Sequence, residues 1–214
     1  MKSIFSFCLT AAVVSAGTLP PPATDVQTQA KTATAVFAGG CFWGVEAVFE
    51  RLKGVQSAVS GFAGGEKRTA HYDMVSEGNT GHAESVQVTY DPSQISYGKL
   101  LQVFFSVAHD PTELNRQGPD QGPQYRSAIF YADAEQKRVA EAYIQQLDTA
   151  KVFRHKIVTQ VAPLKAFYTA EGYHQHYFDL HPSEPYIVYN DLPKVKELEK
   201  QFPELVAKHL SSKL

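Results

Sequence analysis

The stretch that decides the fold is Ala38-Gly-Gly-Cys-Phe-Trp-Gly-Val-Glu46. An apolar segment, residues 34–37, precedes it, and apolar residues recur after it at i, i+3, i+4 and i+7. This spacing predicts a strand that ends at the glycines and an amphipathic helix that begins just after them. Gly54 suits the position immediately beyond the helix C-terminus. Cys41 is therefore expected where a strand ends and a helix begins.

The position of Cys41 favours a reactive thiol. At a helix N-terminus a thiol lies beside free backbone N–H groups at the positive end of the helix dipole, and both lower its pKa. Phe42 and Trp43 follow at once, and large aromatic side chains at a helix start suggest that they line a site. The alternative is a buried, inert cysteine, which is the usual state of a free cysteine.

Length and charge restrict the class of protein. The chain has 214 residues, which is enough for one domain with a full hydrophobic core. Its net charge of −2 argues against a general nucleic-acid binder.

The N-terminus is predicted to be a signal peptide over residues 1–16. Lys2 precedes an apolar run over residues 4–14, and small residues follow it. We therefore expect an exported protein, periplasmic or secreted, with residues 17–33 as a disordered linker rich in Pro, Thr, Gln and Ala. A frayed apolar terminus is the alternative, and a mitochondrial presequence is disfavoured because no Arg precedes Arg51.

Export decides the redox chemistry, because the chain has only two cysteines. Cys8 lies inside the predicted signal peptide, so Cys41 is the one cysteine of the exported chain and has no partner for an intramolecular disulfide. The C-terminal Ser212-Lys-Leu214 matches a peroxisomal address, but an exported chain would not meet that receptor.

The remaining patterns predict an α/β (α+β) fold: a single domain with a central mixed β-sheet flanked by helices, in a two-layer, plait-like arrangement. A glycine-rich turn is expected at residues 60–65 and a long functional loop at 112–124. Strands are expected at residues 55–59, 84–90, 125–131 and 156–162, and helices at 96–108, 133–147, 164–180 and from Pro193 onward.

Glu84 is the second unusual residue. It alternates with Val86 and Val88, so its carboxyl group faces the apolar side of the predicted strand. Burial raises the pKa of a carboxyl group, and a carboxylic acid that keeps its proton near neutral pH can act as a general acid. The alternative is a solvated side chain at the edge of the strand.

Tyr72 and Tyr125 lie in or beside irregular, glycine-rich segments, where a phenol can donate a hydrogen bond to a substrate oxygen. Either side chain could equally be part of the core. Asp120 lies in the long loop, where an aspartate commonly forms a turn.

The histidines do not predict a metal site. His174 and His176 are two residues apart, which does not place them on one helix face, and His181 lies further along. We find no cysteine or carboxylate at a spacing that completes a ligand set. A Cys–His hydrolase is a weaker alternative, since nothing singles out a histidine to pair with Cys41.

Taken together, these motifs resemble the peptide methionine sulfoxide reductase A family. The most specific is Gly40-Cys-Phe-Trp-Gly44, and the ordered set extends the resemblance over residues 34–180. The other segments that carry it are residues 60–65, 80–84, 90–92, 109–111, 115–118, 124–127 and 173–175.

The resemblance implies a role for each candidate residue. Cys41 matches the nucleophile that attacks the sulfoxide sulfur, and Glu84 matches the acid that protonates the oxygen. Tyr72 and Tyr125 match the phenols that hydrogen-bond that oxygen. The product is then methionine and a sulfenic acid on Cys41. Members of the family act on the S epimer of methionine sulfoxide, free or in peptides.

The resemblance also implies a substrate-binding wall. Phe42 and Trp43 match a cage around the substrate methyl group, and Asp120 falls where the family has a supporting acidic residue. Phe62 stands where many members have tyrosine, which removes one hydroxyl group.

The reductase domain is expected over residues 34–214, with 181–214 as a C-terminal extension. Many members carry resolving cysteines in that extension, and this chain has none there. The sulfenic acid then requires an external thiol, from a thioredoxin-like protein or from a glutaredoxin with a small thiol. Residues 185–193 resemble members without a resolving cysteine, in which this segment packs on the domain.

We therefore expect a thiol-dependent reductase that repairs methionine residues after oxidative stress, with no bound cofactor or metal. It is expected to be a monomer without a membrane span, whose partners are oxidised methionine and the thiol reductant. Two other classes remain open. One is a protein that binds Met-rich or oxidised peptides without turnover, and the other is a thiol-based peroxide sensor.

Overall fold

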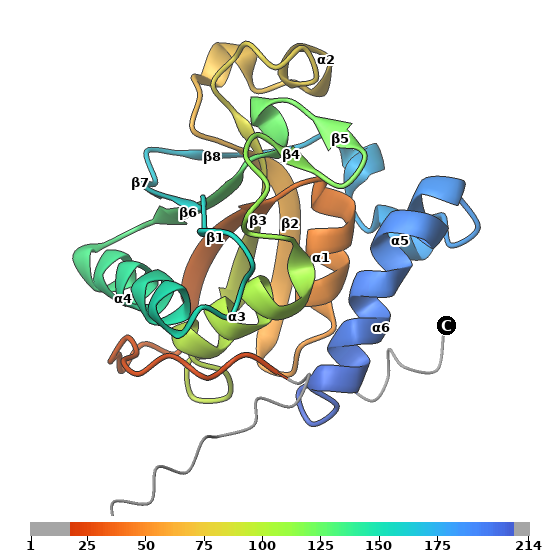
Figure 1. Cartoon of the computed structure of the whole chain (residues 1–214). Helices are drawn as coiled ribbons and strands as arrows, with labels where there is room; N and C mark the ends of the chain where they lie inside the picture. Colours follow the sequence, from red (N-terminus) through yellow and green to blue (C-terminus); the bar gives the residue numbers. More distant parts are fainter. Residues whose placement is uncertain (1–17, 208–214) are drawn as a thin grey trace, which may run out of the picture.

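The computed structural model describes residues 18–207, which form one sheet of six strands, a two-stranded ribbon and six α-helices (Figure 1). The strands are β1 (Ala33–Gly39), β2 (Val55–Ala63), β3 (Ala83–Tyr90), β4 (Arg116–Gln117), β5 (Asp120–Gln121), β6 (Ser127–Tyr131), β7 (Gln160–Pro163) and β8 (Phe167–Thr169). The helices are α1 (Phe42–Glu50), α2 (Tyr72–Val75), α3 (Tyr97–Val103), α4 (Ala134–Ala150), α5 (Tyr177–Leu180) and α6 (Leu192–Gln201).

The main sheet is mixed, with strand order β7-β6-β1-β3-β2-β8. Only β6 and β7 pair in parallel, and every other neighbouring pair is antiparallel. Because β1 and β2 both run antiparallel to β3, they run in the same direction with β3 between them, and α1 makes the crossover. The predicted single domain with a central mixed sheet is thus confirmed.

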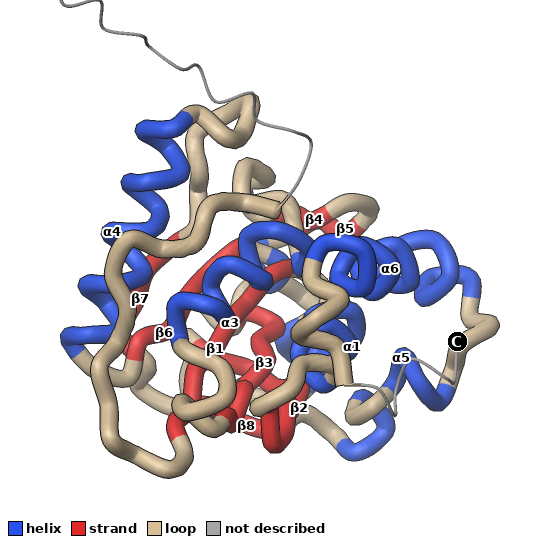
Figure 2. The backbone as a smooth tube through the Cα atoms, turned by 90° about the horizontal axis from the view of Figure 1, so that it is seen from below, coloured by secondary structure: helices blue, strands red, loops and turns tan. Residues whose placement is uncertain are grey.

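The helices cover one face of the sheet, and this makes two layers. On that face Phe37, Val86 and Val88 belong to the main core, together with buried side chains of α1, α3 and α4. The other face carries a smaller cluster, mostly alanine, which packs against Leu164 and Phe167. Figure 2 shows α4 beside β6 and β7, and α5 and α6 on the opposite side of the domain, next to α1.

Three predicted elements differ in the structure. Residues 60–63 continue strand β2 and are not a turn, because this part of β2 pairs with β3 on one side and β8 on the other. Residues 164–180 were predicted to be one helix, but they contain β8 and two short helical segments. The long loop at 112–124 contains the β4–β5 ribbon. In the first two cases contacts between distant segments override the local sequence pattern, whereas the ribbon is a local hairpin.

The segment predicted to be a disordered linker lies against the domain from residue 18 onward and takes no regular structure before β1 (red in Figure 1). Its proline-rich backbone leaves carbonyl groups free, and the Tyr143 hydroxyl donates to Pro20 O at 2.8 Å. Asp25 accepts hydrogen bonds from the Gly98 N–H, at 2.7 Å, and from the Ser96 hydroxyl, at 2.5 Å. The signal peptide predicted over residues 1–16 lies outside the described residues.

Asp25 therefore stabilises the N-terminus of α3 from a distant part of the chain. Asp25→Ala should lower the free energy of unfolding by about 1 kcal/mol, the usual contribution of a helix-capping side chain. Urea denaturation measures this, with the exposed Lys31→Ala as a control from the same segment. Equal stability of the two variants would mean that this segment contributes nothing to the fold.

Candidate active site

All seven residues predicted to form the site line one cavity of about 190 Å³. They come from distant parts of the chain and meet where β1 ends and α1 begins. The lining residues are Cys41, Phe42, Trp43, Tyr72, Glu84, Asp120, Tyr125 and Tyr186, of which only Tyr186 was missed.

Cys41 is the N-cap residue of α1, as the sequence predicted, but its pKa is not lowered. The backbone amide of Trp43 does lower the pKa, as expected at a helix start. Burial outweighs it, since the residue is only 7% exposed, and the carboxyl groups of Glu84 and Asp191 add to the rise. The pKa of the thiol is therefore raised well above its ordinary value.

Glu84 extends from β3 toward the same helix start and is 2% exposed. Its Oε2 accepts a hydrogen bond from the Phe42 N–H at 3.0 Å, next to Cys41 in the chain. Burial, with smaller contributions from Asp120 and Asp191 and against the opposing effect of the Phe42 bond, raises the pKa of Glu84 to about 8. At neutral pH this side chain is a carboxylic acid with a proton to donate.

Tyr72 and Tyr125 reach the cavity from two segments of the chain, one before β3 and one after it. Tyr72 begins the short helix α2, and Tyr125 ends the 3₁₀ turn Pro123–Tyr125. Burial, together with the Glu84 carboxyl, raises the pKa of Tyr72 to about 12 and shifts that of Tyr125 in the same direction. Both phenols therefore keep their protons and can donate hydrogen bonds to an oxygen in the cavity.

The aromatic wall is fixed by its neighbours. Phe42 is fully buried and packs against Phe62, with ring centroids 5.8 Å apart. Trp43 stacks on Tyr177 at 3.8 Å, and its Nε1–H donates to His174 Nδ1 at 3.2 Å. The indole ring is thus held in one orientation beside the cavity, which suits an apolar group such as a methyl.

Tyr186 closes the cavity from the C-terminal extension, between α5 and α6. Its hydroxyl donates a hydrogen bond to Asp120, and its ring meets Trp43 edge-on with centroids 5.8 Å apart. Residues 185–193 stood out in the sequence only as a segment expected to pack on the domain. Its aromatic residue was the available signal, and nothing local in the sequence linked it to Asp120.

A histidine base for Cys41 is absent from the cavity lining. His109 lies near the end of β1, but its Nδ1 contacts Phe104 O at 3.1 Å and its Nε2 contacts Ser127 Oγ at 2.7 Å. Its pKa is lowered to about 3 by burial, so it stays neutral and bound. The arrangement gives no support to the Cys–His hydrolase alternative.

One histidine does lie beside carboxylates, contrary to the sequence analysis. Glu46 and Glu50, one turn apart on α1, have ligand atoms within 4.8 Å of one another and of His176. The sequence pattern did not reveal this because His176 comes from a segment 130 residues further along.

Comparison with known proteins identifies the family of this chain. A family model described as peptide methionine sulfoxide reductase matches residues 33–206. The chain belongs to this family. It is 60% identical over 172 residues to the peptide methionine sulfoxide reductase MsrA 2 of Mesorhizobium japonicum, covering 80% of this chain and 88% of that one.

Two solved structures are similar to this chain over most of its length. The reduced form of Mxr1 from Saccharomyces cerevisiae has a TM-score of 0.66 and 35% identity, covering 75% of this chain and 92% of that one. Methionine sulfoxide reductase A of Corynebacterium diphtheriae has a TM-score of 0.63 and 37% identity, covering 73% and 78% of the two chains. The α/β fold with its mixed sheet is therefore the fold of the family.

The C-terminal extension of this reductase also brings a buried carboxyl group close to Cys41. Asp191 is fully buried, and its Oδ1 lies 3.0 Å from Lys194 Nζ. A Cβ atom added to Gly44 in the first turn of α1 would meet Asp191 Oδ1 at 2.1 Å. Glycine at this position thus allows the carboxyl group to approach the helix start that carries Cys41.

Glycine is also required at position 40 of the reductase signature. Its φ is +88°, and an added Cβ atom would meet the Gln117 side chain at 2.5 Å. Gln117 in turn accepts from the Asp110 N–H at 2.9 Å and donates to Asp110 O at 3.0 Å, so the loop is fixed over the turn. The glycines of the signature are required by neighbours that are distant in the sequence.

Removing the Asp191 charge should lower the pKa of Cys41, because this carboxyl disfavours the thiolate while Lys194 favours it. In a chain carrying Cys8→Ser, the rate of iodoacetamide alkylation as a function of pH measures the pKa of the remaining thiol. Asp191→Asn should move the alkylation profile to lower pH, and Glu197→Gln on α6 should leave it unchanged. A profile that stays in place in Asp191→Asn would show that the buried carboxyl does not act on Cys41.

Proposed function

We propose that this chain reduces the S epimer of methionine sulfoxide, free or in proteins, with Cys41 as the nucleophile and Glu84 as the acid. Reduction of methionine sulfoxide is the activity of the family, which makes the chain an oxidoreductase. One observation carries the assignment of roles. The thiol and the protonated carboxyl are buried in one cavity and joined through Phe42, whose N–H binds Glu84 at 3.0 Å.

The chemistry requires a proton before the sulfur becomes electrophilic, and Glu84 supplies it to the sulfoxide oxygen. As the Cys41 sulfur attacks the substrate sulfur, the thiol proton passes to the Glu84 carboxylate. Glu84 then donates this second proton, so the oxygen leaves as water and a bond joins the two sulfurs. Water attacks Cys41, the bond breaks, methionine leaves, and a proton returns to Glu84. The sulfoxide is reduced and Cys41 is oxidised to the sulfenic acid.

This sequence explains why a raised thiol pKa is compatible with the reaction. The cavity holds two protons at rest, one on Cys41 and one on Glu84, and the departing oxygen needs two. A thiolate formed beforehand would place a buried negative charge close to the Asp191 carboxyl group. Proton transfer during the attack avoids that cost.

The other lining residues position the substrate. Tyr72 and Tyr125 donate hydrogen bonds to the sulfoxide oxygen, and Phe42 and Trp43 contact the methyl group on the other side. Asp120 fixes the Tyr186 hydroxyl and the neighbouring wall. Orienting both ends of the sulfoxide holds its sulfur toward Cys41.

The two alternative functions explain less of the site. A binding protein without turnover has no use for a buried acid beside a buried thiol, which costs stability. A peroxide sensor works through a thiolate of low pKa that is accessible to solvent. Cys41 is 7% exposed and has a raised pKa, so it is poorly suited to that role.

Regeneration of Cys41 then requires a thiol from outside the chain, because the only other cysteine in the sequence, Cys8, lies in the predicted signal peptide. We propose a thioredoxin-like protein, or a glutaredoxin with a small thiol, as the reductant. No helix among residues 18–207 is long and apolar enough to cross a membrane. Residues 1–16 support the further proposal that the protein is exported. We also propose that it is a monomer that repairs proteins after oxidative stress.

The pH dependence of the first turnover tests the acid. Because the pKa of Glu84 is raised to about 8, its acid form predominates below that pH. The rate of methionine formation should therefore fall as pH rises through about 8. Glu84→Gln should lower the rate by about 10²- to 10⁴-fold below pH 8 and should lack this fall. Rapid-quench measurement of methionine in a single turnover gives both results.

Glutamine is a matched replacement, since its carbonyl oxygen can still accept from the Phe42 N–H. The exposed Glu77→Gln is the control and should leave the profile unchanged. If Glu84→Gln keeps the fall near pH 8, another group donates the proton.

Without a reductant, the Cys8→Ser chain should form one methionine per protein molecule and then stop. The reason is that Cys41 remains a sulfenic acid when no second thiol can reach it. Trapping with dimedone and mass spectrometry should place the adduct on Cys41, and Cys41→Ser should form no methionine. Continued turnover without added thiol would contradict the proposed cycle.

A further inference from the structure

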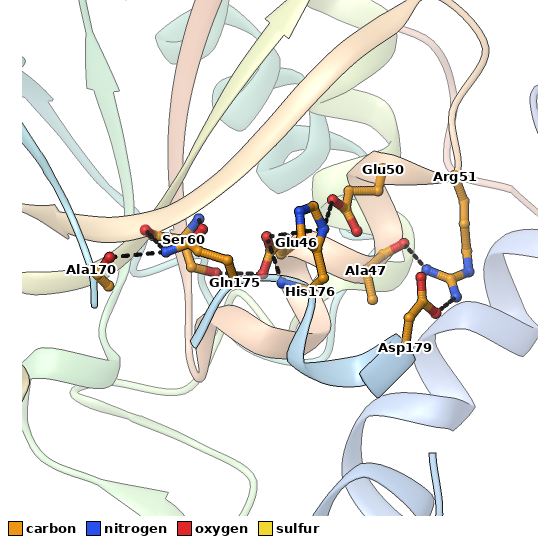
Figure 3. A network of polar contacts seen from close by, with 9 residues as sticks. All are labelled: Glu46, Ala47, Glu50, Arg51, Ser60, Ala170, Gln175, His176 and Asp179. Atoms are coloured by element: carbon orange, nitrogen blue, oxygen red, sulfur yellow. Dashed lines mark hydrogen bonds and ion pairs between the residues drawn. The ribbon is translucent and has the colours of Figure 1, made fainter. Parts of the chain in front are cut away.

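A second group of chemically active side chains lies on α1, outside the cavity. Glu46 and Glu50 are one helical turn apart and share a face, and His176 approaches that face from the segment before α5 (Figure 3). His176 Nδ1 lies 2.6 Å from Glu50 Oε1 and 4.0 Å from Glu46 Oε1. Two oxygen ligands and one nitrogen ligand thus face a common point.

The group is held in place by a surrounding set of hydrogen bonds. Glu46 is 1% exposed, and its Oε2 accepts from the Ser60 hydroxyl at 2.8 Å. Its Oε1 accepts from the His176 N–H at 3.2 Å, which ties the histidine segment to α1. Gln175 in turn binds the backbone N–H and carbonyl of Ser60, both at 3.0 Å (Figure 3). Hydrogen bonds of this kind orient ligating carboxylates in metal sites.

Among residues 18–207, His176 is the basic side chain that lies against these two carboxyl groups. Burial and the neighbouring Glu50 raise the pKa of Glu46 to about 7, and burial also raises that of Glu50. Arg51 is the next residue, but its guanidinium is directed to Asp179 at 2.5 Å and to Ala47 O at 2.9 Å (Figure 3). Only His176 faces both carboxyls, and a divalent cation would satisfy them more completely.

We propose that Glu46, Glu50 and His176 bind a divalent transition-metal ion of the Zn²⁺ type. Carboxylate oxygen and imidazole nitrogen are ordinary Zn²⁺ ligands, with bonds of about 2.0–2.2 Å. Ligand atoms on a tetrahedral ion lie roughly 3.4 Å apart at that bond length. The ligand atoms here lie within 4.8 Å of one another, so small side-chain rotations bring them to that distance. The ion would lie between the imidazole nitrogen and the two carboxylates.

The choice of metal follows from the ligands. Ca²⁺ and Mg²⁺ prefer sites made only of oxygen, whereas imidazole suits Zn²⁺ and its neighbours in the first transition series. His176 is 61% exposed in its side chain and Glu50 17%, so water can reach the remaining coordination positions.

Binding would join two elements that support the substrate wall. Helix α1 carries Trp43 near its start, and the segment that carries His176 also carries His174, which accepts the Trp43 Nε1–H. An ion at this site is a structural link behind the wall and takes no part in the sulfoxide chemistry. Because it binds the folded chain, it should raise the melting temperature.

The test is metal binding to the full chain without an affinity tag and with Cys8→Ser and Cys41→Ser, so that no thiol competes for the ion. Calorimetric titration with Zn²⁺ should show one ion per chain, and Co²⁺ should give a visible absorption spectrum at the same stoichiometry. Excess Mg²⁺ should not displace either ion. Zn²⁺ should also raise the melting temperature.

Two ligand variants locate the ion. Glu50→Gln and His176→Asn should each weaken Zn²⁺ binding at least about tenfold and abolish the rise in melting temperature. Asparagine is chosen because His176 has φ +54°, which asparagine tolerates, so the fold is retained. His155→Ala removes an exposed imidazole elsewhere and should bind Zn²⁺ as the parent does. Absence of binding by the parent chain, or binding that both ligand variants retain, would overturn the proposal.

Discussion

The hydrogen bond from the Phe42 N–H to Glu84 Oε2, 3.0 Å long, is the contact on which the site depends. It fastens the Glu84 side chain on β3 to the residue that follows Cys41, so one backbone group places Cys41 and Glu84 together. The strand order of the sheet makes this possible, because β3 pairs directly with β1, and α1 begins just after β1 ends. The bond lowers the pKa of Glu84, yet burial prevails and the proton stays.

Much of the fold and the site could be predicted because their signals are local. The strand, the glycines and the amphipathic pattern around Cys41 define the β1–α1 junction, and alternation along residues 84–90 turns Glu84 toward the core. The sequence could not show the other neighbours of Cys41. Burial raises the pKa of the thiol, and Glu84 and Asp191, the latter 150 residues away in the chain, add to the rise, so the shift is opposite to the one expected from the helix terminus alone.

The C-terminal extension forms part of the site as well as packing on the domain. It contributes Tyr186 to the cavity wall and Asp191 to the charge near Cys41, in a chain that has no cysteine there. Contacts of this kind depend on tertiary structure and leave no periodic signal in the sequence. Strand β8 is a similar case, because it pairs with β2 although its segment has a helical pattern. For the same reason the sequence could not show that His176 lies next to Glu46 and Glu50.

The central claim is that the resting cavity holds a protonated Glu84 beside a protonated Cys41. The most direct measurement is the ¹³C NMR titration of the glutamate side-chain carboxyl carbons in the reductase. The account predicts a resonance that titrates near pH 8 and is missing from Glu84→Gln. A Glu84 resonance that titrates near the ordinary glutamate pKa of about 4.3 would contradict it.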